Sequence, residues 1–239
     1  MVKRSILERV LAFIYPERCC CCGKPVACGS VVCEACRPEL HRITPPVCPM
    51  CGRGDGECGC GRHKRHTDRC VAPFYYSGAA KSALHRLKFG GKEYVAEMFA
   101  LAMEQTVIRE YRTVKFDCVT AVPLSLSVQK ARKYNQSVLL AKRLSSLLGI
   151  TYRDLLIKQC ETIPQRELPA FRRSGNVLGV FDVALQDIES MESGFNVLLV
   201  DDTVTTGATL DECAKMLKLY GAKYVYAVTA TASRLPDDS

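Results

Sequence analysis

The placement of cysteine constrains this 239-residue chain more than any other feature. Of its 15 cysteines, 12 fall between Cys19 and Cys70. The other three are Cys118, Cys160 and Cys213. Charged residues interrupt the first 15 positions before any signal-like apolar block develops, so we expect a cytoplasmic protein. In a reducing compartment such a density of cysteine indicates bound metal rather than disulfides. We therefore assign residues 1–70 to an N-terminal helix followed by a double zinc-binding segment.

Eight of these cysteines form closely spaced pairs that are typical of zinc knuckles, in which two thiolates converge on one tetrahedral ion. The first set comprises Cys19, Cys22, Cys33 and Cys36, and the second comprises Cys48, Cys51, Cys58 and Cys60. His63 follows Cys60 at C-x2-H spacing and is an alternative ligand of the second set. A closed site with four protein ligands leaves no position for water, so we expect two structural Zn2+ ions rather than a catalytic one.

The overall composition is that of an ordinary globular protein. Apolar residues make up 48%, charged residues 24% and aromatic residues 8% of the chain, which excludes disordered and fibrous classes. No apolar run approaches the roughly 20 residues that cross a bilayer, so we expect no membrane span. The formal net charge is +8. Two zinc ions held by eight thiolates would lower it to about +4, which weakens the case for general nucleic-acid binding.

Beyond residue 70 the sequence alternates between strand-like and helix-like segments. Short apolar runs predict strands at residues 71–76, 117–122, 195–200 and 224–229. Longer periodic segments predict helices at residues 79–89, 93–111, 128–148 and 210–220. This alternation is typical of an α/β domain with a mainly parallel sheet flanked by helices, which we assign to residues 71–239.

The most informative segment is NVLLVDDTVTTGATL, at residues 196–210. An apolar strand is followed by Asp201 and Asp202, and a hydroxyl-rich loop then leads into a helix. Backbone amides at a helix start can hold a phosphate group. The two carboxylates can accept hydrogen bonds from sugar hydroxyls or hold a metal ion through water. The alternative is an ordinary capped helix after an acidic turn.

At these residues the chain resembles the 5-phosphoribosyl 1-diphosphate (PRPP) binding motif of type I phosphoribosyltransferases. Over nearly its whole length it resembles the ComF family, in which a zinc-ribbon segment precedes such a domain. Further matching strings are PERC at residues 16–19, LKF at 87–89, VPLS at 122–125, NQS at 135–137, TIPQ at 162–165 and RSGNVLGVF at 173–181. Residues 132–136 read RKYNQ where RGFNQ is commoner in the family, so this loop lacks a glycine and has an extra cation.

The resemblance implies roles for individual residues. Asp201 and Asp202 would bind the ribose hydroxyls. All four histidines precede residue 86, so the later strands supply no histidine as a general base, and either aspartate could act as the catalytic base instead. The resemblance also implies a PRPP site with Mg2+. Its other members would be Thr203, Val204, Thr205, Thr206, Gly207, Ala208, Thr209, Lys88, Pro123, Leu124, Arg132 and Lys133.

The resemblance implies a phosphoribosyltransferase-type protein with a part in the uptake of transforming DNA. Its partners would then include single-stranded DNA and a DNA-translocating ATPase. Nothing in the sequence identifies an acceptor, so enzyme activity stays an open question. One alternative is a non-catalytic PRPP sensor, or a module whose zinc ribbons bind nucleic acid or protein. Residues 16–70 contain no Phe, Tyr or Trp, which argues against base stacking by the ribbons themselves. Another alternative is a zinc-ribbon regulator with a vestigial α/β domain.

Overall fold

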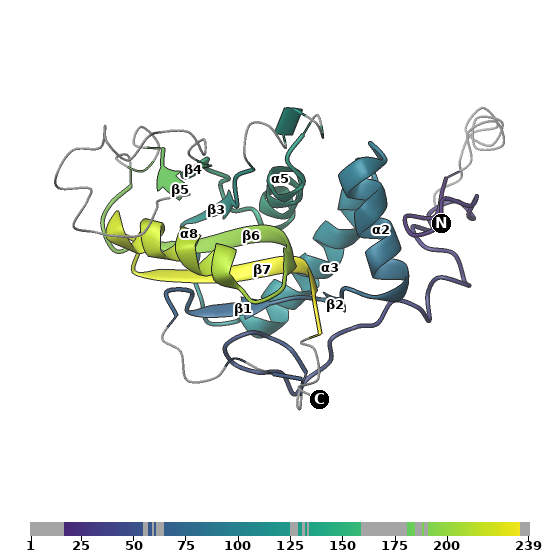
Figure 1. Cartoon of the computed structure of the whole chain (residues 1–239), viewed down its shortest axis with the longest axis horizontal. Helices are drawn as coiled ribbons and strands as arrows, with labels where there is room; N and C mark the ends of the chain where they lie inside the picture. The colour runs from purple at the N-terminus through teal and green to yellow at the C-terminus, as the bar shows by residue number, and fades with distance from the viewer. Residues whose placement is uncertain are drawn as a thin grey trace, which may run out of the picture.

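A five-stranded sheet in which every pairing is parallel lies at the centre of the structure (Figure 1). The computed structural model describes residues 17–54, 57–58, 60, 65–124, 129–130, 132, 134–158, 181–184, 188 and 191–234. The strand order is β1-β7-β6-β3, and β2 also pairs with β7. The strands are β1 (Arg69–Val71), β2 (Phe74–Tyr75), β3 (Cys118–Ala121), β6 (Asn196–Val204) and β7 (Tyr224–Ala232).

The two central strands are longer than the sequence pattern predicts. β6 was expected to end at Val200 but continues to Val204, because β7 runs beside it to Ala232 and supplies pairing partners. Asp201 and Asp202 therefore lie within a strand rather than after it. At the sheet edge, the single strand expected at residues 71–76 is divided into β1 and β2. Pro73 lies at the break, where it has no backbone N–H to donate to a ladder.

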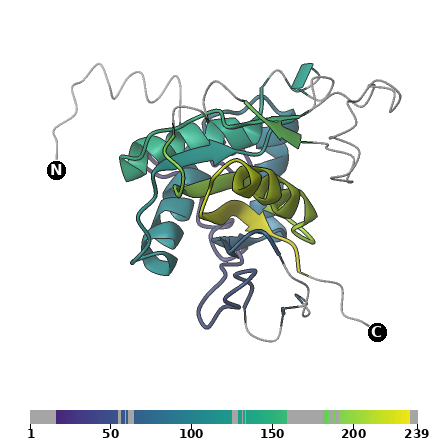
Figure 2. The same ribbon diagram turned by 90° about the vertical axis from the view of Figure 1, so that its left-hand side faces the viewer.

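Helices cover both faces of the sheet, as expected for this class of fold (Figure 2). Helices α3 (Val95–Glu110) and α5 (Gln136–Leu148) pack together on one face, and α2 (Gly78–Phe89) packs against α3. Helix α8 (Ala208–Leu219) covers β6 and β7 on the other face. Buried apolar side chains fill both layers, so each face of the sheet has its own core. The expected mainly parallel α/β fold with flanking helices is confirmed.

Two local features differ from the sequence prediction. The helix expected over residues 128–148 contains a break, and α5 begins only at Gln136. The reason is Asn135, whose side chain accepts hydrogen bonds from the amides of Ser137 and Val138 and so caps a new helix start. A small antiparallel pair, β4 (Leu156–Lys158) with β5 (Phe181–Val183), was not predicted.

The cysteine-rich segment packs on the α/β part in two places. The first zinc ribbon, which contains Cys19, Cys22, Cys33 and Cys36, lies beside α2 (Figure 1). The second zinc ribbon, which contains Cys48, Cys51, Cys58 and Cys60, lies below β1 and β2. Backbone hydrogen bonds cover this edge of the sheet: Tyr75 donates to the carbonyl of His41 at 2.9 Å, and Cys70 donates to that of Met50 at 2.8 Å. The division of the chain at residue 70 stays a prediction. In the part of the chain that the structure describes, no helix is long and apolar enough to span a membrane.

Candidate zinc and phosphate sites

Two groups of four cysteines have the geometry of tetrahedral zinc sites. In each group all four sulfur atoms lie within 4.8 Å of one another. A tetrahedral ion with Zn–S bonds of about 2.3 Å places its sulfurs about 3.8 Å apart. The Sγ atoms of Cys22 and Cys33 are 3.8 Å apart, and those of Cys51 and Cys58 are 3.7 Å apart. The groups are Cys19, Cys22, Cys33 and Cys36, then Cys48, Cys51, Cys58 and Cys60.

Backbone amides point at the sulfurs, as a bound thiolate requires. The amide of Cys33 donates to Cys19 Sγ at 3.4 Å, and that of Met50 donates to Cys48 Sγ at 3.4 Å. Burial raises the pKa of both thiols, but hydrogen bonds from backbone amides and from neighbouring cysteine side chains outweigh it and lower the pKa to about 6 for Cys19 and about 7 for Cys48. Burial and the same kind of sulfur contact raise the pKa of Cys36 and Cys60, so within each group the proton is shared unequally. The two groups therefore fit two structural zinc ions, with all eight predicted ligands. His63 lies outside the described residues.

Four side chains from three elements meet where the carboxyl end of β6 approaches α2 and α5. Lys88 of α2 lies with its Nζ 2.7 Å from Asp202 Oδ1. Ser137, in the first turn of α5, donates from its hydroxyl to Asp201 Oδ1 at 2.7 Å. The amide of Asp202 donates to the same oxygen at 2.8 Å. The structure thus brings together the predicted residues Asp201, Asp202 and Lys88.

Asp201 is the most perturbed carboxyl of this group. Desolvation by burial is the largest cause, and the charge of Asp202 adds to it. The hydroxyl of Ser137, the amide of Asp202 and the charge of Lys88 act in the opposite direction. The net effect raises the pKa of Asp201 to about 7, so this carboxyl gains or loses its proton near physiological pH.

The expected phosphate loop follows these acids directly. Strand β6 ends at Val204, and α8 begins at Ala208 after Gly207, which has a positive φ of 85°. This short turn exposes Thr205, Thr206, Ala208 and Thr209 to solvent. The turn before α8 therefore lies at an open surface, where the dipole of the helix favours an anion.

Two of the predicted loop residues use their side chains inside the protein. The Thr203 hydroxyl pairs with that of Thr231 at 3.0 Å, and Val204 is only 2% exposed. The structure places both in β6, so neither side chain points into the open loop. Thr206 has a local role as well, because its hydroxyl accepts a hydrogen bond from the Ala208 amide at 3.3 Å.

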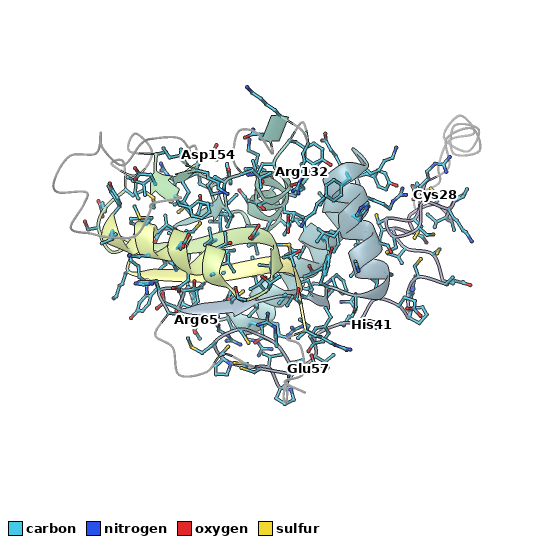
Figure 3. All side chains as sticks on the ribbon, viewed as in Figure 1. Cys28, His41, Glu57, Arg65, Arg132 and Asp154 are labelled. Carbon is cyan, nitrogen blue, oxygen red and sulfur yellow. The ribbon has the colours of Figure 1, made fainter. Side chains whose placement is uncertain are left out.

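Three further predicted PRPP residues, Pro123, Leu124 and Arg132, lie around the start of α5. Pro123 and Leu124 follow β3 and are half-buried, and the preceding carbonyl of Val122 accepts from the Asn135 side chain at 3.0 Å. Arg132 lies between α5 and α2 (Figure 3), with its guanidinium 5.0 Å from the centre of the Phe89 ring and 3.1 Å from Gln136 Oε1. Lys133, together with residues 162–165 and 173–180 of the matching strings, lies outside the described residues.

Among the side chains that contact this site, Ser137 and Arg53 were missed by sequence reasoning. Ser137 is the partner of Asp201, and its position in the NQS string was the available signal. Arg53 is the second: it comes from the second zinc ribbon, yet its Nη2 donates to the carbonyl of Thr205 in the phosphate loop. Its place after a knuckle cysteine and glycine predicts an exposed turn residue, so no sequence signal could have found that contact.

Comparison with known proteins agrees with the zinc-binding part of this description. Residues 10–72 match the family described as double zinc ribbon domain. The DNA utilization protein YhgH of Salmonella typhi is 30% identical over 221 residues, which cover 88% of this chain and 94% of that protein. Competence protein F of Haemophilus influenzae is 29% identical, covering 81% of this chain and 87% of its own. Competence protein ComFC of Bacillus subtilis is 28% identical, covering 78% and 77%.

Among solved structures, adenine phosphoribosyltransferase from Saccharomyces cerevisiae is 14% identical, with a TM-score of 0.40 over 61% of this chain and 72% of that one. The allosteric regulatory enzyme of purine biosynthesis is 21% identical, with a TM-score of 0.41 over 60% of this chain and only 29% of that enzyme's length. The sequence relatives decide the family, because the match to YhgH spans almost the whole of both proteins. The chain belongs to the family of YhgH and the ComF competence proteins.

Proposed function

We propose that the α/β part of this protein binds PRPP together with Mg2+. One observation supports this above all others: two adjacent acids at the end of a central strand lead within three residues to an exposed hydroxyl-rich turn at a helix N-terminus. A sugar phosphate can use both features, since carboxylates accept hydrogen bonds from ribose hydroxyls and helix amides hold a phosphate. In a parallel α/β sheet such ligands bind beyond the carboxyl ends of the strands, where this turn lies.

The proposal gives each described group a part. Asp201 and Asp202 accept hydrogen bonds from the ribose hydroxyls, and residues 205–209 hold the 5-phosphate. The pyrophosphate lies toward Lys88, residues 122–124 and the basic residues Arg132 and Lys133. Mg2+, when bound, neutralises pyrophosphate charge, and the two acids of β6 are the groups that fit it through water.

Phosphoribosyl transfer would require little covalent chemistry from the protein. The bond between the sugar C1 and the pyrophosphate oxygen breaks, and an acceptor forms a new bond at C1 from the opposite side. Fixed amides and cations position the two phosphate groups and stabilise the leaving charge. Asp201 or Asp202 would take a proton from the acceptor, and the raised pKa of Asp201, about 7, suits a group that gains and loses a proton near neutral pH.

The names of the relatives connect the family to competence and DNA use, so we also propose a part in the uptake of transforming single-stranded DNA. One surface feature supports a contact with single strands. Phe89 is 62% exposed, and its ring centre lies 4.8 Å from that of His85. The Arg132 guanidinium lies over the same ring, 5.0 Å from its centre. An exposed aromatic ring beside a cationic group is an arrangement on which unpaired bases stack. A DNA-translocating ATPase is the protein partner that this role requires.

A test of this second role uses fluorescent oligonucleotides without secondary structure. Phe89→Ala should weaken binding about tenfold, since stacking of one base contributes about 1–3 kcal/mol. Leu219→Ala is the matched control, because Leu219 is 68% exposed and lies on α8. Equal binding by wild type and Phe89→Ala would exclude this ring as the contact and leave the ribbons as the alternative nucleic-acid or protein-binding surface.

Thermal unfolding tests PRPP binding. A ligand that binds only the folded state stabilises it, by about 2.7 kcal/mol at a hundredfold excess over Kd. PRPP with Mg2+ should raise the melting temperature of the wild type and of Asp154→Asn, an exposed acid outside the site, but not that of the Asp201→Asn, Asp202→Asn double variant. No shift in any of the three would contradict the proposal.

Pyrophosphate release separates the enzyme from the sensor. The zinc-loaded protein is given PRPP, Mg2+ and a panel of nucleobases and amines, and pyrophosphate is measured. Release that depends on one acceptor identifies a transferase and its substrate class. PRPP binding without release from any acceptor supports the non-catalytic sensor instead.

A further inference from the structure

Arg53 is a fully buried cation in the second zinc ribbon. It comes two residues after the zinc ligand Cys51, and it is only 1% exposed. Its Nε donates to the carbonyl of Ser233 at 2.8 Å, and its Nη2 donates to the carbonyl of Thr205. Among the described residues no carboxylate forms an ion pair with Arg53. A buried guanidinium that bonds only to backbone carbonyls acts as a structural link between separate segments.

The knuckle holds Arg53 from one side. The amide of Cys48 donates to the Arg53 carbonyl at 2.7 Å, and the amide of Gly52 donates to the Cys48 carbonyl at 2.9 Å. Gly52 has a φ of 66°, and a Cβ there would lie 2.5 Å from the carbonyl oxygen of Cys70 in β1. The knuckle thus lies directly on the backbone of β1. The same turn that holds the metal ligands Cys48 and Cys51 also positions Arg53.

The sheet holds the other end of Arg53. Thr205 is the first residue after β6, and Ser233 is the first after β7. The Ser233 amide donates to the Val204 carbonyl at 2.8 Å, so the ends of both strands are already joined at this point. Arg53 bonds to both strand ends at the place where the phosphate loop leaves the sheet.

The charge of the second zinc site also favours the burial of Arg53 beside it. Four thiolates around one Zn2+ have a net charge of −2, which stabilises a guanidinium buried nearby. The first zinc site has a different neighbour: a Cβ on Gly23 of its knuckle would lie 2.7 Å from an Nη atom of Arg86, which belongs to α2. Only the second site is linked through a buried side chain to the phosphate loop in the part of the chain that the structure describes.

We propose that Arg53 couples the second zinc site to the phosphate loop. Zinc held by Cys48, Cys51, Cys58 and Cys60 fixes Arg53, and Arg53 fixes Thr205 and with it the turn into α8. Because coupling between two binding sites is reciprocal, a ligand held by the loop must raise the affinity of the second site for zinc. The effect of a loop ligand on zinc binding rests on the proposed binding of PRPP. The claim that Arg53 orders the loop does not depend on PRPP.

Hydrogen exchange of the ligand-free protein tests the link itself. Each zinc site contains one exposed ligand, Cys22 in the first and Cys58 in the second, which gives a matched pair of variants. Cys58→Ser should speed amide exchange at residues 203–210 about tenfold, the loss expected when a hydrogen bond to a charged group is no longer fixed. Cys22→Ser should leave exchange in this segment unchanged. Equal effects of the two variants, or no effect of Cys58→Ser, would overturn the proposal.

Arg53→Gln tests the residue that forms the link. It should speed exchange at residues 203–210 as much as Cys58→Ser does while the protein retains two zinc ions per chain, because all eight cysteines are intact. Unchanged exchange in a folded Arg53→Gln protein would overturn the role of Arg53. Should this variant fail to fold, Arg53→Lys retains the charge but cannot donate in two directions from a planar group, and an intermediate rate of exchange is expected.

Equilibrium competition with a coloured zinc chelator tests the reciprocal effect. PRPP with Mg2+ should raise the affinity for one of the two zinc ions about tenfold in the wild type and have no such effect in Arg53→Gln. If calorimetry shows that PRPP does not bind, the proposed function fails and the exchange experiment still decides the link. If PRPP binds the wild type but the affinity for both zinc ions is unchanged, the coupling fails and the proposed function stands.

Discussion

Lys88 Nζ lies 2.7 Å from Asp202 Oδ1, and the two side chains are only 18% and 12% exposed. Lys88 belongs to α2 and Asp202 to β6, so this ion pair joins a helix to the acidic end of the central strand. One of the two predicted ribose-binding acids is thus paired with the cation that we place beside the pyrophosphate. A bound sugar phosphate must share or replace this pair.

Lys88→Met should both destabilise the protein and weaken PRPP binding. The change leaves a largely buried carboxylate without its cation, which should lower the free energy of unfolding by about 2 kcal/mol. It also removes a charge from the proposed pyrophosphate site, so Kd should rise at least tenfold. Urea unfolding and calorimetric titration measure the two effects. The control is Lys81→Met on the exposed side of the same helix, which should change neither. A loss of stability with unchanged Kd would exclude Lys88 from the ligand site.

The affinity for PRPP should depend on the ionisation of Asp201. Burial is the largest cause that raises its pKa, which reaches about 7, so at pH 6 most molecules have a neutral Asp201. A neutral carboxyl is a poorer acceptor for ribose hydroxyls, and affinity should therefore rise between pH 6 and pH 8. Calorimetry across this range should show the rise in the wild type and a flat profile in Asp201→Asn. A profile that is equally steep in both proteins would assign the dependence to another group.

Ionisation of Asp201 should lower the stability of the folded protein as pH rises, whereas it raises the affinity for PRPP. Below pH 4 Asp201 is protonated in both the folded and the unfolded state and contributes nothing. Between pH 4 and pH 7 the unfolded state loses this proton and the folded state retains it, so the free energy of unfolding falls as pH rises. Asp201→Asn should thus gain stability relative to wild type over this window, measured by urea unfolding. A difference in the free energy of unfolding between the two proteins that stays constant with pH would contradict the raised pKa of Asp201.

Ser137→Ala should move the pH dependence of PRPP binding upward. The Ser137 hydroxyl donates to Asp201 Oδ1 at 2.7 Å and so favours the ionised carboxylate. Without it the pKa of Asp201 rises further, and the midpoint of the affinity profile should shift to higher pH while affinity at high pH falls only slightly. Ser146→Ala is the control, because this exposed serine lies on the same helix and donates to a helix carbonyl. An unshifted midpoint in Ser137→Ala would mean that this hydrogen bond has no functional role.

The zinc content should follow the two cysteine groups. Elemental analysis of the wild type should give two zinc ions per chain, one for each group of four sulfurs. Cys33→Ser and Cys58→Ser should each retain one ion. Cys28→Ser should retain both, because Cys28 is exposed and belongs to neither group. A single ion in the wild type, or loss of zinc from Cys28→Ser, would contradict this assignment.

The features that the sequence predicts well are those with a local physical cause. The spacing of Cys19, Cys22, Cys33 and Cys36 is sufficient to assign a zinc site, because ligands close in sequence can reach one ion without knowledge of the fold. The apolar run before Asp201 predicts a buried parallel strand for a similar reason, since such strands are apolar on both faces.

The features that the sequence does not predict depend on contacts between distant segments. The extension of β6 to Val204 requires β7 beside it, and the late start of α5 depends on Asn135 contacting both the helix amides and the Val122 carbonyl. The bond from Arg53 to Thr205 joins residues 152 positions apart. Local propensity contains no information on such pairs.

Calorimetric titration of the zinc-loaded protein with PRPP and Mg2+ at pH 8 tests the central claim most directly. The wild type should bind one PRPP per chain with a Kd in the micromolar range, about −8 kcal/mol. The Asp201→Asn, Asp202→Asn double variant, with its two zinc ions retained, should give no binding heat, and Asp154→Asn should bind as the wild type does. Absence of binding by the wild type, or equal binding by the double variant, would contradict a PRPP site at the carboxyl end of β6.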